Sequence, residues 1–291
     1  MVKNNKNRLS LLLALVAAFA LEACGSARHI REAQDHFNKA SAAENSMRAS
    51  ELGFPAGSRS VPAQSSPRDQ YLLALEAASA VISQSKSDLR REKLLGHAYM
   101  LQAITLWRLA YYESANYRFV RRGQCAATHP RLTAMSGVMD TIRTDLQRKD
   151  PIVLGTRDRV MFVALPGLRD HDKGLFAPDY AGAARCFASA YAVLEQAVGL
   201  RSAIRGPLQD DHPVRLYIRL AQLQTLAAWN RRLSTSGLKR SQRTPIIKSD
   251  IRPRTIKTAN AICALQKGGM AGAHKAATRL LMAIGVPHKC R

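Results

Sequence analysis

Apolar residues recur every three or four positions through most of this chain, the spacing that places them on one side of an α-helix. Runs in which apolar and polar residues alternate, as in a half-buried β-strand, are almost absent. The pattern therefore predicts an all-α protein in which helices pack on helices, either as antiparallel pairs in an array or as an irregular bundle.

Glycine, proline and serine divide this pattern into segments. A first helical block extends from about Arg28 to Leu52, and residues 50–67, ten of which are Ser, Gly or Pro, are expected to form a loop. The Gly and Pro residues between 155 and 178 predict a second looped region around the apolar strip Val160–Leu165. Further helices are expected over residues 68–83, 88–121, 128–150, 180–198 and 214–233.

The block over residues 88–121 carries two apolar lines instead of one. A surface helix keeps one broad polar face, so a helix that is apolar on two sides is expected in the middle of a stack. The residues expected to be buried occupy recurrent apolar positions of the long helices and are Leu101, Ile104, Leu109, Phe187, Leu194, Leu220 and Leu223.

Short motifs within these helices resemble the tetratricopeptide repeat, a family of stacked helix pairs. The matching residues are Leu95-Gly96-x-x-Tyr99 for the first helix of a repeat, and Tyr112 with Ala115, Ala183-x-x-x-Phe187-x-x-Ala190 and Ala33-x-x-x-Phe37-x-x-Ala40 for the second. The regular period is not kept, and Arg108 occupies the position of a small second-helix Ala. The resemblance implies a degenerate array over about a third of the chain, with a groove that binds a peptide or protein.

The first 23 residues have the pattern of a signal peptide. Basic residues at 3, 6 and 8 precede an apolar run, Leu11–Leu21, which as a helix would be only about 16 Å long and too short to cross a membrane. The sequence Leu21-Glu22-Ala23-Cys24 then resembles the bacterial lipobox, although Glu22 departs from its usual small or aliphatic residue. The resemblance implies cleavage before Cys24 and attachment of diacylglycerol and palmitate to it. An ordinary secretory signal is the alternative.

The resemblance to bacterial lipoproteins also implies a location. Gly25 stands where a signal for retention in the inner membrane would place Asp, so the expected location is the outer membrane, facing the periplasm. Export would leave Cys125, Cys186, Cys263 and Cys290 in an oxidising compartment, where disulfides are favoured over free thiols. Three pairings are possible, and the one in chain order joins Cys125 to Cys186 and Cys263 to Cys290.

Positive charge is concentrated near the C-terminus. The chain has 44 Lys and Arg against 21 Asp and Glu, and the last 61 residues contain 14 basic residues and only one acid, Asp250. Because Pro245 and Pro253 interrupt residues 238–257, that stretch is expected to be extended and solvated. Its candidate residues for binding an anionic lipid or polysaccharide surface are Lys239, Arg240, Arg243, Arg252 and Arg254. Export and the lack of interleaved aromatic residues argue against a nucleic acid partner.

We find no catalytic, nucleotide-binding or zinc-binding motif and expect neither a cofactor nor a metal ion. The two tight acid and imidazole clusters are Asp170-His171-Asp172 and Asp210-Asp211-His212. They are expected to make local contacts, and an acid/base or metal role is the alternative.

These observations predict a signal peptide over residues 1–23, a helical domain over residues 24–235 and a basic segment over residues 236–291 with one or two helices. The favoured function is a lipid-anchored scaffold of the cell envelope that binds a protein or peptide partner, for example within a transport or envelope-assembly complex. The alternatives are an enzyme that modifies an envelope polymer and a structural lipoprotein that binds an anionic polymer.

Overall fold

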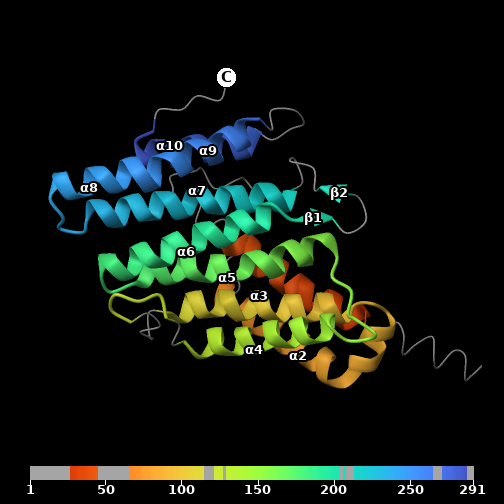
Figure 1. Ribbon diagram of the computed structural model, residues 1–291. Helices are drawn as coiled ribbons and strands as arrows, with labels where there is room; N and C mark the ends of the chain where they lie inside the picture. Colours follow the sequence, from red (N-terminus) through yellow and green to blue (C-terminus); the bar gives the residue numbers. More distant parts are fainter. Residues whose placement is uncertain are drawn as a thin grey trace, which may run out of the picture. The chain divides into compact units, whose positions relative to one another are not determined.

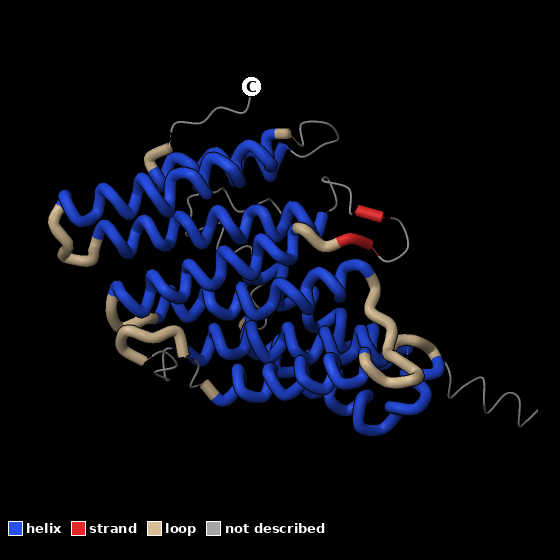
Figure 2. Tube along the Cα trace, in the orientation of Figure 1, coloured by secondary structure: helices blue, strands red, loops and turns tan. Residues whose placement is uncertain are grey.

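The computed structural model describes residues 27–44, 66–114, 121–126, 129–202, 206–207, 213–264 and 271–286 (Figure 1). The expected signal peptide, Cys24, most of the loop over residues 50–67, Ala115 and Cys290 lie outside these residues. The all-α class is confirmed, since helices make up nearly all of the described chain (Figure 2). Its described strands, β1 (Arg201–Ser202) and β2 (Gly206–Pro207), form one antiparallel pair of two residues each.

A first helix covers residues 27–44. The helices that follow are α2 (Pro67–Arg91), α3 (Leu95–Glu113), α4 (Pro130–Leu146), α5 (Thr156–Phe176), α6 (Tyr180–Val198) and α7 (Pro213–Ser234). The C-terminal helices are α8 (Arg240–Ile246), the π-helical turn η2 (Ile247–Ile251), α9 (Arg252–Cys263) and α10 (Ala271–Ile284).

The chain divides into two compact units. Unit 1 comprises Met1–Tyr112 and Ala134–Val153, and unit 2 comprises Glu113–Thr133 and Leu154–Arg291. Within unit 2, α5 packs beside α6, α6 beside α7, and α7 beside both α9 and α10, as can be followed in Figure 1.

Six of the seven residues expected to be buried are buried, and the exception is Leu220. Leu220 is half-buried because it packs against the outside of a core cluster in unit 2 that consists of Leu223, Ala259, Ile262, Ala277 and Leu281.

The central helix of unit 1 is α3, which is buried on most of its sides, as its two apolar lines predict. The prediction of one helix over residues 88–121 is wrong, because Asp88 belongs to α2 and residues 92–94 form a turn before α3. At this turn the Leu94 N–H donates to the Leu89 carbonyl oxygen, and Lys93 has a φ of 60°. Glycine usually occupies that left-handed position after a helix. Because Lys stands there, the sequence contains no signal that the helix ends.

The looped region expected between residues 155 and 178 is instead helix α5, with Pro166 inside it. Its glycines allow α6 to approach closely. A Cβ at Gly167 would lie 3.0 Å from the Ala190 carbonyl oxygen, and one at Gly174 would lie 2.5 Å from the Phe187 ring. These residues therefore serve helix packing, and tertiary contacts override their weak helix propensity.

The extended conformation expected for residues 238–257 is also wrong. The chain from Arg240 to Cys263 is helical, and η2 lies between Pro245 in α8 and Pro253 at the start of α9. Pro253 stands in the first turn of α9, where the missing N–H of proline is tolerated, and Pro245 lies inside α8. Ile251 is fully buried, so this segment is attached to the core of unit 2.

The structure describes most residues of the motifs that resemble the tetratricopeptide repeat. Ala183, Phe187 and Ala190 are fully buried on α6, the second helix of the pair α5–α6. Tyr112, however, lies on the same continuous helix as Leu95, so its assignment to the second helix of a repeat is wrong. The structure of α3 thus departs from repeat geometry.

Candidate functional site

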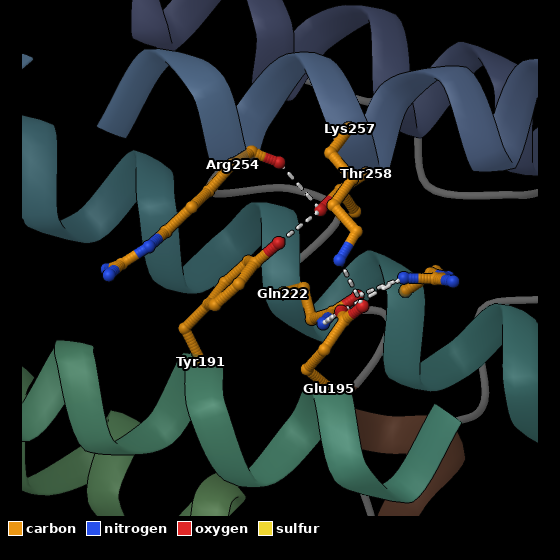
Figure 3. Close-up of polar contacts among 7 residues, drawn as sticks. Tyr191, Glu195, Gln222, Arg254, Lys257 and Thr258 are labelled. Atoms are coloured by element: carbon orange, nitrogen blue, oxygen red, sulfur yellow. Dashed lines mark hydrogen bonds and ion pairs between the residues drawn. The ribbon is translucent and has the colours of Figure 1, made fainter. Parts of the chain in front are cut away.

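The basic C-terminal helices are held on unit 2 by a polar cluster that joins α6, α7 and α9 (Figure 3). Glu195 on α6 is its centre. The Lys257 Nζ lies 2.7 Å from Glu195 Oε1, and Gln222 Nε2 and Arg219 Nη1 donate to Glu195 Oε2 at 2.6 and 3.2 Å. Burial of Glu195 raises its pKa, but the hydrogen bonds from Lys257 and Gln222, with the charge of Arg219, outweigh burial and lower the pKa. The hydrogen bond between Lys257 and Glu195 also raises the pKa of Lys257.

A second group of contacts lies beside this cluster (Figure 3). The hydroxyl of Thr258 donates to the Arg254 carbonyl oxygen at 2.9 Å, so the Tyr191 hydroxyl is the donor in its 3.2 Å bond to Thr258. The Arg254 guanidinium lies over the rings of Tyr191 and Trp229, 5.4 and 5.6 Å from their centroids, and 3.7 Å from Asp250. Arg254 therefore packs against its own unit.

Arg243 is also used internally, because its Nη1 donates to the Ser234 carbonyl oxygen at the turn between α7 and α8. Of the five basic residues selected from the sequence, Lys239, Arg240 and Arg252 remain exposed. Lys248 on η2 is exposed as well. We call Lys239, Arg240, Lys248 and Arg252 the basic face.

Among the residues that the structure describes, no acid forms an ion pair with any of the four cations of the basic face. Lys239 is the N-cap residue of α8, and Arg240, Lys248 and Arg252 lie on the helical segment α8–η2–α9, whose buried residues begin at Ile251. The helical conformation sets the backbone positions of these cations before any partner arrives. Clustered charges of one sign attract anionic partners over about 8 Å at physiological salt, and fixed positions reduce the ordering cost of binding. The basic face can therefore bind an anion.

The selection made from the sequence did not include Lys248, and it included Arg243 and Arg254, which make contacts within unit 2. The charge pattern locates the segment, but all of these residues look alike in a stretch that is expected to be extended. A helical prediction would have placed Arg254 one turn before Thr258 and three residues after Ile251, on the inward side with the buried residues.

The first acid cluster is structural. Asp170 and Asp172 on α5 are buried, and Asp170 accepts hydrogen bonds from Ser189 on α6 at 2.7 Å and from Arg169 at 3.0 Å, with Lys173 Nζ at 3.1 Å. Burial lowers the pKa of Lys173, and Asp170 partly opposes this shift. His171 is 3.0 Å from the Thr225 hydroxyl on α7. These contacts tie α5 to its neighbours.

The second cluster, Asp210-Asp211-His212, lies outside the described residues. Within the described ranges, no group of three or more His, Cys, Asp or Glu residues is placed to hold a metal ion.

A disulfide joins Cys125, in the loop before α4, to Cys186 on α6, with 5.1 Å between their Cα atoms. This is the first of the two pairs in the chain-order prediction. Cys263 is also disulfide-bonded, and its expected partner Cys290 lies outside the described residues.

Unit 1 contains a pocket of about 360 Å³ between the α2–α3 turn and the segment Asp150–Val153. Two of its cations are already paired, since Arg90 lies 2.9 Å from Asp145 and Arg91 lies 2.8 Å from Asp88. Its volume is at the lower end of the range of small-molecule pockets, about 300–1,000 Å³.

No protein-family model, curated protein or solved structure matches this chain. In addition, none of the helices in the described ranges combines the length and apolar character that crossing a membrane requires.

Proposed function

We propose that this protein is a lipid-anchored scaffold of the bacterial cell envelope, attached through acylated Cys24 to the outer membrane with its helices in the periplasm. Through the basic face it binds a protein or peptide partner that presents acidic side chains. The stacked helices, which we take to be a degenerate tetratricopeptide-like array, carry this face and hold it in position.

Two observations support the anchor and the compartment. Cys24 follows a charged and then apolar leader and ends a sequence similar to the lipobox. The Cys125–Cys186 disulfide is of the kind that forms and persists in oxidising compartments such as the periplasm.

The observation that carries the binding function is the set of four exposed cations between the N-cap of α8 and the start of α9, without acidic partners among the described residues. In a folded protein most surface cations are interspersed with acids. Cations that no acid of their own unit neutralises are complementary to an acidic surface on a partner. Such complementarity raises association rates and specificity.

The test compares two variants of the full-length protein with equal loss of charge. The first replaces Lys239, Arg240, Lys248 and Arg252 by Gln. The control replaces four exposed basic residues elsewhere, Lys93, Lys149, Arg157 and Arg185, by Gln. After cross-linking in cells and detergent extraction, the wild type and the control should carry the same partner protein, and the first variant should lose it.

Retention of that protein by the first variant would contradict the proposal. A different outcome is that lipopolysaccharide or another anionic polymer, and not a protein, is recovered with the wild type and is lost from the first variant. The basic face would then bind a polymer, as the alternative function states.

A further inference from the structure

The first helix, residues 27–44, is an integral part of unit 1. Its apolar side, formed by Ile30, Ala33, Phe37 and Ala40, is buried. The Phe37 ring packs edge-on against Tyr71 of α2, with 5.4 Å between centroids, and His36 Nδ1 lies 2.9 Å from Gln70 Oε1. The helix cannot leave unit 1 without exposing this apolar side to water.

A buried ion pair fixes the far end of the same helix. Glu44 pairs with Arg108 in the middle of α3, and both side chains are at most 10% exposed. The Tyr71 hydroxyl donates to Glu44 at 2.9 Å, and the Arg108 guanidinium lies over the rings of Trp107 and Tyr111 at 4.6 and 4.8 Å. Separation of the helix would leave a buried charge without its partner, so the helix and the body of unit 1 move together.

The position of Cys24 along the chain then limits how far unit 1 can be from a membrane. Cys24 precedes the described start of the helix by three residues, and three residues span at most about 11 Å. We propose that unit 1 rests directly on the membrane in which the acyl chains of Cys24 are inserted, with Arg28 and Arg31 on the phosphate groups of its phospholipids. This inference rests on the lipid anchor of the proposed function.

The charges at the start of the helix fit this contact. Arg28 and Arg31 are exposed and form no ion pair with the other residues that the structure describes. Because the mature chain would begin at Cys24, both lie within its first two helical turns. Cations at the N-terminal end oppose the helix dipole, so they do not serve helix stability there. The arginine guanidinium binds phosphate groups through paired hydrogen bonds.

The test measures the distance of the helix start from the bilayer in the full lipidated protein. A bimane fluorophore on His29→Cys reports quenching by phosphatidylcholine that is brominated high on its acyl chains. The matched control inserts about 20 Gly and Ser residues after Ser26, which keeps the anchor and adds a tether of about 25 Å. We expect strong quenching in the protein with the native spacing and loss of more than half of it after the insertion.

The charge contribution is tested in the protein with the insertion, where the anchor no longer forces contact. Addition of phosphatidylglycerol to the vesicles should restore part of the quenching. The variant Arg28→Gln/Arg31→Gln should lose this restoration, and Lys39→Gln, about 12 Å further along the helix from residue 31, should keep it.

The outcomes separate this inference from the proposed function. Mass spectrometry that finds Cys24 without acyl chains would overturn both. Acylated Cys24 with quenching as weak at the native spacing as after the insertion would overturn the inference alone, and an equal effect of phosphatidylglycerol on all variants would overturn the contact by Arg28 and Arg31.

Discussion

Individual side chains explain departures from simple patterns in this chain. Arg108 is a charged residue in the mostly apolar helix α3, yet it is buried. Its guanidinium is compensated by Glu44 and covered by aromatic rings. The sequence shows an arginine in an apolar helix but not its partner, because Glu44 is 64 residues away. Burial of this charge therefore depends on a contact that periodicity does not reveal.

The first prediction concerns this pair. Arg108→Ala should lower the free energy of unfolding of unit 1 by about 3–5 kcal/mol, because it leaves the buried Glu44 carboxylate without its cationic partner. Urea denaturation followed by the fluorescence of Trp107, in a Trp229→Phe background, measures it. As a control, Arg143→Ala removes an exposed pair with Asp140 and should cost about 0–1 kcal/mol. Equal effects of the two substitutions would mean that the pair is not desolvated.

The second prediction concerns Glu195 and pH. Its folded-state pKa is lower than its ordinary value of 4.5, so its contribution to stability is fully present above that value and is lost as pH falls through the folded-state pKa. Glu195→Gln should therefore reduce the loss of stability of unit 2 between about pH 6 and about pH 3. Urea denaturation at each pH, followed by Trp229 in a Trp107→Phe background, gives the two profiles. If the free energy of unfolding falls with pH in parallel for the wild type and for Glu195→Gln, Lys257 and Gln222 do not stabilise the Glu195 carboxylate.

At the scale of whole helices, periodicity predicted α6 and α7 well, and local breaking signals led to wrong predictions for α5 and for α8–α9. Asp179 accepts a hydrogen bond from the Gly182 N–H and caps α6. In α5, by contrast, Gly167 and Gly174 are present because α6 lies against them. A glycine required for close packing and a glycine that ends a helix are identical in a sequence, so only the neighbouring helix distinguishes them.

The third prediction tests this packing. Gly174→Ala would bring a Cβ within 2.5 Å of the Phe187 ring and should destabilise unit 2 by about 1–3 kcal/mol. Gly137→Ala on α4 is the matched control, since nothing lies within 4 Å of its Cβ, and it should stabilise by about 0.5–1 kcal/mol. Thermal unfolding by circular dichroism measures both. A neutral or stabilising Gly174→Ala would show that α5 and α6 are not in close contact there.

At the scale of the whole molecule, the charge and the cysteine content of the sequence predicted two features. The excess of positive charge in the last 61 residues located the basic face, and the even number of cysteines after Cys24 suggested disulfides. Which cations remain exposed depends on the helical conformation of residues 240–263 and on contacts with α6 and α7. Those contacts join residues far apart in the sequence, so the composition could locate the segment but not select its members.

The most direct measurement is the mass of the N-terminal peptide of the protein extracted from bacterial membranes, compared with Cys24→Ser. We expect the wild type to begin at Cys24 and to carry acyl chains, and Cys24→Ser to be released as a soluble form or to remain an uncleaved precursor. An unmodified Cys24 within an intact leader in the wild-type membrane fraction would contradict the lipid anchor on which the proposed scaffold depends.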